Sequence, residues 1–277
     1  MHNFIDKIKH VFLRIKTYKN WYTLVWPMTR ILPKARIIYT RTGCKIFVRD
    51  VRGDDYAVVH EMFVRDDYKI KSIQADKPVV LDFGANIGVF SVAMARRFPG
   101  AKVISFEPEK SNYEILEKNA KLNPGVIPVR KAISNQTGEQ EFFSSLHKYS
   151  SSLIREHMVE STFSEKVSRV TIGDILNEYN LDKIDIIKMD IEGGEIKALR
   201  GMNDTIKKNQ VVLITEYAPF YFEDPTELIR IIEEVGFKTI YNLFDNGKVE
   251  LFDYNNINRY IPEGKNITSN TNLVCTK

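Results

Sequence analysis

Carboxylates recur in this chain at the ends of apolar segments, where they could bind a ligand or move a proton. Asp82, Glu107, Asp190 and Glu216 each lie at or near the end of a run with the composition of a buried strand. Ligands of open α/β sheets bind outside the carboxyl ends of the strands. Because four converging acids repel one another, folding alone explains them poorly. The pattern therefore predicts a functional site along this rim of a sheet.

The segment VVLDFGANIG at 79–88 predicts a strand, a tight glycine loop and the start of a helix. Gly84 and Gly88 would let the backbone approach a ligand that a Cβ atom would push away. Glu107 ends the following predicted strand, where a carboxylate can accept hydrogen bonds from ribose hydroxyls. This layout is typical of a nucleotide-binding βαβ unit, although a strand-to-helix turn without a ligand is the simpler alternative.

The spacing of this loop separates two classes of cofactor. A dinucleotide-binding loop has the pattern G-x-G-x-x-G and faces a pyrophosphate, whereas this chain has D-x-G-x-N-x-G. Asp82 would repel a diphosphate, which disfavours a nicotinamide dehydrogenase. A carboxylate suits S-adenosylmethionine, which has a ribose, an amino-acid tail and a sulfonium but no phosphate. The expected cofactor-binding residues are Asp82, Gly84, Ala85, Asn86, Gly88, Glu107, Pro108 and Ala132.

A second dense cluster, DIIKMDIEGGE, ends another predicted strand with three acids close to a lysine. Strand alternation places Lys188 and Asp190 on the same face, so Lys188 either neutralises Asp190 or Glu216 or orients an acceptor hydroxyl. Glu192 and Glu195 could instead cap the N-terminus of a helix. The residues expected to carry the chemistry are Lys188, Asp190, Glu192, Glu195 and Glu216.

Strands and helices alternate from residue 77 onward, and four strands are near-continuous apolar runs, as in parallel sheets. We expect an α/β, Rossmann-like, doubly wound fold with a mostly parallel seven-stranded sheet. The expected strands are 79–83, 102–106, 126–131, 184–189, 211–216, 238–241 and 273–276, and the expected helices are 89–97, 111–122, 195–202 and 226–235. A helix through residue 179 should begin with a capping box of Thr171 and Asp174. Residues 139–144 indicate an inserted strand, and 145–168 a mobile loop.

Residues 1–75 are predicted to extend the main domain at 76–277 with a helix, a short hairpin over 36–50 and a second helix over 56–64. One face of the first helix carries Phe4, Ile5, Ile8, Val11, Phe12 and Ile15. Its other face is basic, so this helix could lie on an anionic membrane surface. Packing of the apolar face on the protein itself or on a second subunit is the commoner role and is favoured.

Length and composition limit the domain organisation and the classes of partner that the chain can have. The 277 residues suffice for one large α/β domain with an extension. The formal charge of +4, from 40 basic and 36 acidic side chains, is too small to indicate nucleic-acid binding. Cys44 and Cys275 share no metal-ligand spacing, and the sequence has neither a recognisable signal peptide nor a transmembrane-length apolar run. We therefore expect a cytoplasmic protein, peripheral to a membrane if its N-terminal helix binds one.

These motifs resemble the FkbM family of S-adenosylmethionine-dependent methyltransferases. The segments that carry the resemblance are VLDFGANIG, FEP, DIIKMDIEGGE, Asn119, LN at 122–123, LRG at 199–201, Glu216 and, upstream, RGDD at 52–55 with Glu61. The chain departs from the family's pattern at 172–173, where Ile-Gly replaces the usual Leu-Asp, and at Gly194, where alanine is more usual. The resemblance implies O-methylation of a hydroxyl on a sugar of a glycan or glycoconjugate, or on a natural product.

A hydroxyl of this kind has a high pKa and benefits from a base that accepts its proton as the C–O bond forms. In the reaction that the resemblance implies, Asp190 is the expected base and Glu192 the second choice. Glu195 and Glu216 would bind acceptor hydroxyls or Lys188. These four acids could also hold a divalent cation, but no histidine accompanies them in the motif and the lysine competes for them, so no metal is expected.

Two other classes of function fit less well. Amino-methyltransferases that act on nucleic acids share an Asn/Asp-Pro-Pro-aromatic block after the fourth strand. This chain has DIEG at that place, and its acids would repel phosphates. A non-catalytic cofactor-binding scaffold would be expected to lose its rim carboxylates, whereas this chain keeps them.

The sequence does not identify the acceptor or the oligomeric state. Residues 145–168 and 217–225 are expected to shape the acceptor pocket, with Tyr217, Phe220, Tyr221 and Phe222 either stacking on a sugar or filling core.

Overall fold

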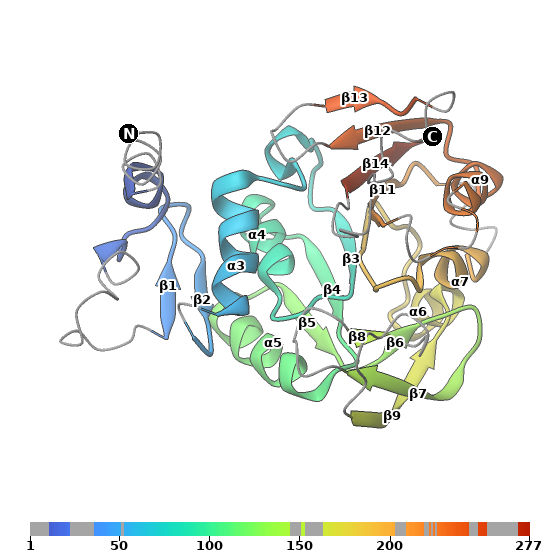
Figure 1. Ribbon diagram of the computed structural model, residues 1–277, viewed down its shortest axis with the longest axis horizontal. Helices are drawn as coiled ribbons and strands as arrows, with labels where there is room; N and C mark the ends of the chain where they lie inside the picture. Colours follow the sequence, from blue (N-terminus) through green and yellow to red (C-terminus); the bar gives the residue numbers. More distant parts are fainter. Residues whose placement is uncertain are drawn as a thin grey trace.

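The computed structural model describes residues 11–22, 36–50, 53–144, 151–152, 163–202, 209–218, 222, 224, 226–243, 249–253 and 271–277. A central sheet of eight described strands organises the fold (Figure 1). From one edge to the other, the strands are β13 (Val249–Leu251), β12 (Thr239–Leu243), β14 (Thr271–Thr276), β11 (Val212–Tyr217), β10 (Ile186–Met189), β3 (Val79–Phe83), β4 (Lys102–Phe106) and β5 (Val126–Val129).

The strand order confirms the mostly parallel, doubly wound sheet. Strands β11, β10, β3, β4 and β5 pair in parallel, while β14 runs antiparallel between β11 and β12. The sheet has one strand more than the seven expected, because β13 pairs antiparallel with β12 and adds an edge. The chain order reverses between β3 and β10, so the carboxyl ends of these two strands flank a topological switch point. Ligands of such sheets bind there.

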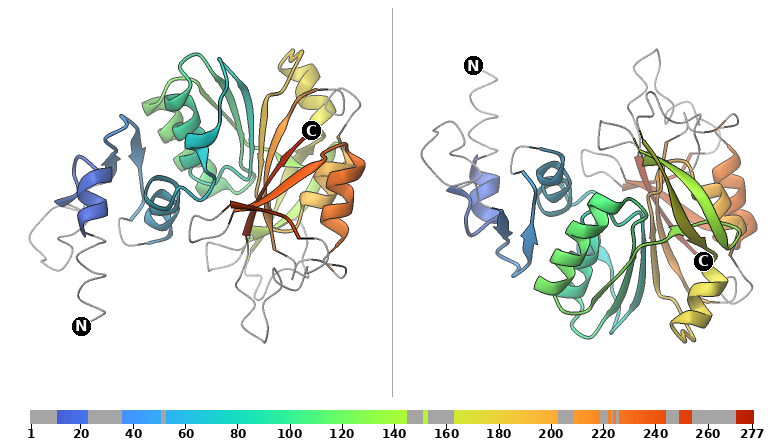
Figure 2. Two further views of the ribbon diagram at one scale, coloured as in Figure 1. Left: turned by 90° about the horizontal axis from the view of Figure 1, so that it is seen from above. Right: turned by 90° about the horizontal axis from the view of Figure 1, so that it is seen from below.

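Helices cover both faces of the sheet. Helices α4 (Val89–Arg97) and α5 (Lys110–Leu122) pack on one face, and α6 (Ile172–Glu178), α7 (Glu195–Arg200) and α9 (Glu227–Glu234) on the other (Figures 1 and 2). Alternation along β3 divides the core accordingly. Leu81 and Phe83 join the core under α6, α7 and α9, whereas Val80 joins the core under α4 and α5. The apolar runs of the sequence are thus buried from both sides.

Side-chain caps fix where two of these helices begin. The predicted capping box is confirmed: Asp174 N donates to Thr171 Oγ1 (3.1 Å), and Thr171 N donates to Asp174 Oδ2 (3.0 Å). Glu109 caps α5 by accepting hydrogen bonds from the backbone nitrogens of Ser111 (2.9 Å) and Asn112 (2.7 Å). The second cap places the start of α5 directly after the end of β4, beside the expected cofactor loop.

A second sheet corrects one expectation. Strands β6 (Ala132–Ile133), β9 (Phe163–Val170), β7 (Gly138–Ser144) and β8 (Ser151–Ser152) form a separate four-stranded sheet in that order. The expected inserted strand at 139–144 is β7, but residues 163–168 belong to β9 and not to a mobile loop. Their sequence is polar, so backbone pairing with β7 defines this strand. The rest of the predicted loop, 145–150 and 153–162, lies outside the described residues.

The N-terminal part docks on the α4 and α5 side of the sheet (Figure 2). Residues 11–17 are helical, and β1 (Ile37–Tyr39) pairs with β2 (Lys45–Phe47) as the predicted hairpin. The Asn119 side chain binds this hairpin to α5, because Phe47 N donates to its Oδ1 (2.6 Å) and its Nδ2 donates to Phe47 O (3.1 Å). Arg49 and Asp55 form a further ion pair of 2.6 Å.

The second predicted helix of the extension begins earlier than expected and changes its winding. Helix α3 (Asp54–His60) continues into a π-helix, η1 (Glu61–Arg65), and a 3-10 helix, η2 (Ile70–Ser72), precedes β3. Between them, Asp66 and Lys69 adopt left-handed conformations with φ of 56° and 49°. A π-helix is often found at functional sites, and this one lies next to the cavity described below.

Candidate active site

A cavity of about 300 Å³ opens at the switch point between β3 and β10. Loops after β3, β4 and β10 contribute to its wall, as do α4, β6, β7 and the N-terminal segment. Its lining includes Glu61, Met62, Tyr68, Gly84, Ala85, Asn86, Glu107, Pro108, Ala132, Lys188, Asp190, Glu192 and Glu216. Most of the predicted site residues are therefore brought together.

The two glycines of the loop were both expected to face the ligand, but each is also packed closely against protein. Gly84 has φ +72°, and a Cβ atom built there would lie 1.8 Å from the carbonyl oxygen of Asp190. At Gly88, with φ +83°, a Cβ atom would lie 2.5 Å from Leu116 Cδ1. Gly88 does not line the cavity. Both glycines thus allow close packing of protein on protein, and only Gly84 also faces the ligand space.

Glu107 occupies the expected place at the end of β4 and is held by two backbone donors. Asn86 N donates to its Oε2 (2.7 Å) and Glu109 N to its Oε1 (3.0 Å). Burial raises the pKa of Glu107 to about 7, although these two hydrogen bonds act in the opposite direction. Each carboxylate oxygen has a second lone pair that can accept from a ligand hydroxyl. Asn86 keeps φ +51°, an unusual conformation for a non-glycine residue at the cavity wall.

Asp82 does not line the cavity, which corrects its expected contact with the cofactor. Its side chain is 0% exposed. It accepts a hydrogen bond from Ser91 Oγ (2.6 Å), and its Oδ1 lies 3.5 Å from Lys188 Nζ. The Asp82 carboxylate therefore contacts Lys188 and does not face the cavity.

Lys188 lies at the centre of this buried charge cluster. Its Nζ donates to the carbonyl oxygen of Gly84 (2.8 Å) and lies 3.5 Å from both Asp82 Oδ1 and Asp190 Oδ2. Burial by itself would lower the pKa of Lys188, but Asp190, Asp82 and Glu107 offset this and raise it above the usual value. The ammonium group therefore stays charged. Its contact with Asp190 confirms the prediction that both side chains share one face of the strand.

Asp190 is held from the opposite side by a residue that the sequence analysis missed. The Tyr68 hydroxyl donates to Asp190 Oδ2 (3.1 Å), the same oxygen that faces Lys188. Burial, followed by the charges of Asp190 and Glu216, raises the pKa of Tyr68 well above its usual value, so the hydroxyl keeps its proton and donates. Tyr68 is 122 positions from Asp190, and no local motif marks it.

The remaining acids divide into two groups. Glu192 and Glu216 line the cavity, and Glu192 has φ +54° in the turn after β10. Glu195 does not line it: this side chain is 2% exposed and accepts a hydrogen bond from Ile191 N (2.9 Å). Burial raises the pKa of Glu195 to about 7. Glu195 thus stabilises the turn after β10, and among the described residues it forms no ion pair with Lys188.

A metal site does not assemble from these acids within the described ranges. No group of three or more histidine, cysteine, aspartate or glutamate side chains is placed to hold an ion among the described residues. Nor does any helix of the described residues have the length and apolarity needed to cross a membrane.

Two of the four aromatic residues that were expected to stack on a sugar or fill core, Tyr217 and Phe222, are among the described residues. Tyr217 is 0% exposed and packs edge-on against Phe252 with ring centroids 5.8 Å apart, so it fills core. Phe222 is partly buried against the same core. Residues 220 and 221 lie outside the described residues.

Comparison with known proteins identifies the family. Residues 82–239 match the methyltransferase FkbM domain. The chain belongs to the FkbM methyltransferase family. Among curated relatives, the hexuronic acid methyltransferase AglP of Haloferax volcanii is 25% identical over 69% of this chain and 73% of its own length. The 2-O-methyltransferase NoeI of Sinorhizobium fredii is 25% identical over 68% and 81%, and the methyltransferase sdnD of Sordaria araneosa 29% identical over 53% and 68%.

Solved structures include the methyltransferase FkbM of Methylobacillus flagellatus, with a TM-score of 0.47 and 16% identity over 80% of this chain and 55% of that one. The family match and these relatives make the present chain an S-adenosylmethionine-dependent methyltransferase. The cavity fits that cofactor, because the buried Glu107 carboxylate offers acceptor positions to ribose hydroxyls next to the glycine loop. Ala85, Asn86, Pro108 and Ala132 line the same space.

Proposed function

We propose that this enzyme methylates a hydroxyl group on a sugar of a glycan or glycoconjugate. The observation that carries the proposal is the placement of Asp190, a partly exposed carboxylate at the cavity that Lys188 and Tyr68 both contact through Oδ2. The Asp190 side chain is 28% exposed, so part of its carboxylate can still meet an acceptor hydroxyl. The names of AglP and NoeI, a hexuronic acid methyltransferase and a 2-O-methyltransferase, are in keeping with a sugar acceptor.

The residues would act by alignment and proton transfer. When bound, S-adenosylmethionine would supply an activated methyl group, and cleavage of its sulfur–methyl bond would leave S-adenosylhomocysteine as the neutral leaving group. Asp190 accepts the proton of the acceptor hydroxyl as the oxygen–carbon bond forms. Lys188 cannot serve as this base, since its ammonium is charged and contacts two carboxylates and a carbonyl. Its role is to hold the Asp190 side chain in place. Glu192 and Glu216 line the same cavity and would accept hydrogen bonds from further hydroxyls of the acceptor.

The experiment offers the full chain S-adenosylmethionine with a tritiated methyl group and a panel of neutral glycosides, matched uronides, glycolipid extracts and phenolic natural products. We expect label in a sugar product that resists alkali, because methyl ethers survive conditions that hydrolyse methyl esters. Nuclear magnetic resonance of the product then locates the methylated oxygen.

Other results point to other functions. Label that alkali removes would mean carboxylate methylation and would overturn the choice of a hydroxyl. Label in the phenolic compounds alone would favour the natural-product alternative. Tight binding of S-adenosylmethionine by calorimetry without transfer to any acceptor would favour a cofactor-binding scaffold.

A further inference from the structure

The charge of this chain is divided very unevenly along the sequence. Residues 1–49 contain eleven lysines and arginines and a single acid, Asp6, for a formal charge of +10. Residues 50–277 contain 29 basic and 35 acidic side chains, for a formal charge of −6. The overall charge of +4 hides this division. Such an asymmetry indicates a partner with negative charge for the N-terminal segment.

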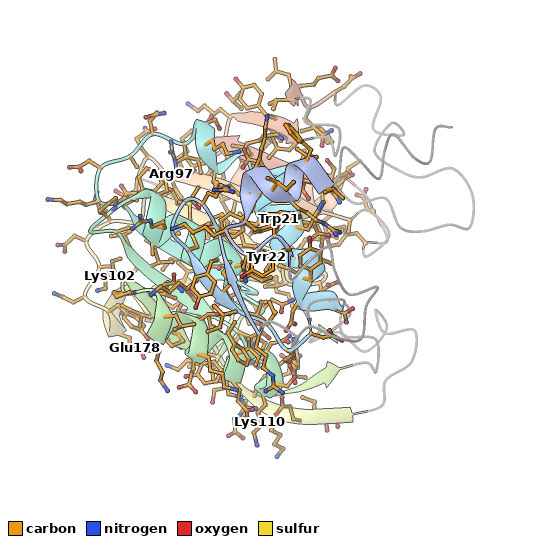
Figure 3. All side chains as sticks on the ribbon, turned by 90° about the vertical axis from the view of Figure 1, so that its left-hand side faces the viewer. Trp21, Tyr22, Arg97, Lys102, Lys110 and Glu178 are labelled. Atoms are coloured by element: carbon orange, nitrogen blue, oxygen red, sulfur yellow. The ribbon has the colours of Figure 1, made fainter. Side chains whose placement is uncertain are left out.

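Large apolar side chains are exposed in the same segment. In the described ranges, six large hydrophobic residues are exposed, and four of them lie here: Phe12 (56%), Leu13 (41%), Tyr22 (51%) and Tyr39 (39%). Trp21 and Tyr22 lie together at the end of the N-terminal helix (Figure 3). The other two, Val249 and Leu251, lie in β13, the edge strand of the central sheet, away from the N-terminal helix (Figure 1). The exposed apolar surface is thus concentrated where the positive charge is.

This segment docks on the protein without covering those side chains. Tyr18 is 0% exposed and anchors the end of the helix in the core. Lys19 N donates to Tyr39 O (2.7 Å), and Tyr39 N donates to Asn20 Oδ1 (3.0 Å), which places the hairpin beside the helix end. Phe12 was expected on the packed face of the helix, but it is more than half exposed. The apolar side chains are therefore left on a surface that is already firmly attached.

Basic side chains accompany the exposed apolar ones. Lys16 and Lys19 are both exposed, and Lys16 Nζ lies 4.8 Å from the centre of the Phe12 ring. Aromatic and leucine side chains enter the boundary between headgroups and acyl chains, while lysines pair with the headgroup phosphates. We propose that the surface formed by Phe12, Leu13, Lys16, Lys19, Tyr22 and Tyr39, the N-terminal surface, binds anionic phospholipid membranes.

Two other partners fit this surface less well. A nucleic acid would use the lysines but gives no reason for exposed Phe12 and Leu13, because its backbone contacts are polar. A second copy of the chain would use the apolar side chains. However, a symmetric interface would bring two segments of charge +10 against each other. An anionic membrane satisfies both the charge and the apolar side chains.

Vesicle co-sedimentation of the full chain tests this inference, and it needs no acceptor, so its result is independent of the methyl-transfer proposal. Phosphatidylcholine vesicles are compared with vesicles that also contain phosphatidylglycerol, at low and high salt. We expect binding only to the anionic vesicles, weakened by salt. Lys16→Glu with Lys19→Glu should lower the partition coefficient at least about tenfold, and Phe12→Ser with Leu13→Ser should also lower it.

Matched variants outside the N-terminal surface provide the controls. Lys197→Glu with Lys238→Glu makes the same change of charge, and Leu251→Ser removes an equally exposed apolar side chain; both should bind as wild type does. Calorimetry with S-adenosylhomocysteine verifies that every variant is folded. Absence of wild-type binding to anionic vesicles would overturn the inference, as would equal losses in the control variants. A stable dimer that the Phe12 and Leu13 changes dissociate, without vesicle binding, would assign the surface to a second copy.

Discussion

The Tyr68 hydroxyl donates a hydrogen bond of 3.1 Å to Oδ2 of Asp190, from a segment that precedes the first strand of the sheet. Tyr68 packs edge-on against Phe90 (centroids 5.6 Å apart), and Lys188 Nζ lies 5.9 Å from the centre of its ring. Glu61 and Met62 of η1 line the same cavity. The match to the FkbM domain begins only at residue 82. The segment before it therefore contributes a wall of the site as well as covering the sheet.

Tyr68→Phe removes this hydrogen bond and keeps the packed ring. A hydrogen bond to a charged group contributes about 1.5–3 kcal/mol, so we expect kcat to fall roughly tenfold or more. Because the hydroxyl holds Asp190 Oδ2 in place, its loss should lower kcat and leave the affinity for S-adenosylhomocysteine, measured by calorimetry, unchanged. A wild-type kcat would mean that Tyr68 serves packing alone, and Tyr113→Phe, outside the cavity, is the control.

Asp190→Asn tests the proposed base directly. Methyl transfer should fall by a factor of about 10² to 10⁴, the usual contribution of general base catalysis. Calorimetry should still detect the cofactor, because Glu107 and its backbone partners are untouched. The exposed Asp182→Asn is the matched control and should transfer methyl groups at the wild-type rate. Wild-type turnover by Asp190→Asn would exclude Asp190 as the base and make Glu192 the next candidate.

Glu107→Gln tests whether the carboxylate at the end of β4 binds the cofactor. A ribose hydroxyl donates to the ionised form, and burial raises the pKa of Glu107 to about 7. Affinity for S-adenosylhomocysteine should therefore increase between pH 6 and pH 8 in the wild type by more than in the variant, in which this group no longer titrates. Calorimetry across this range measures the difference. Parallel pH dependences in the two proteins would argue against the contact.

Glu195→Gln should stabilise the protein at alkaline pH. Burial raises the pKa of this carboxyl group to about 7 from an ordinary value of 4.5. The folded state thus binds a proton more tightly than the unfolded state, and stability decreases as pH rises from about 4.5 to 7. A glutamine can still accept from Ile191 N without the charge. At pH 8 the gain should approach, at most, about 3 kcal/mol by urea unfolding, and it should vanish near pH 4.

Gly84→Ala tests whether residue 84 must be glycine because of the close approach of the Asp190 carbonyl or only because of its positive φ. Its Cβ atom would collide with the Asp190 carbonyl, whereas at Gly236, with φ +100°, a Cβ atom meets nothing within 4 Å. We expect Gly236→Ala to cost about 1–2 kcal/mol of stability, the cost of the left-handed conformation. Gly84→Ala should cost clearly more and also weaken cofactor binding. Equal losses in urea unfolding would show that the close approach of the two loops is unimportant.

The sequence by itself determined the α/β fold class and most of the rim. Apolar runs and glycine turns are local signals, so β3, β4 and β10 and the helices that follow them lie close to where the pattern placed them. The same local order put Glu107, Lys188 and Asp190 at one edge of the sheet, since carboxyl ends of parallel strands meet there. The capping box at Thr171 was readable for the same reason.

Only the tertiary structure decided which side chains reach the cavity. Asp82 and Glu195 resemble ligand-binding acids in sequence, yet packing buries both of them against protein donors. Strand β9 follows from pairing with β7 and not from its polar composition. Tyr68 reaches Asp190 because the N-terminal segment folds back across the end of the sheet. Contacts of this kind join residues far apart in the chain, so no pattern of spacing within either segment could have revealed them.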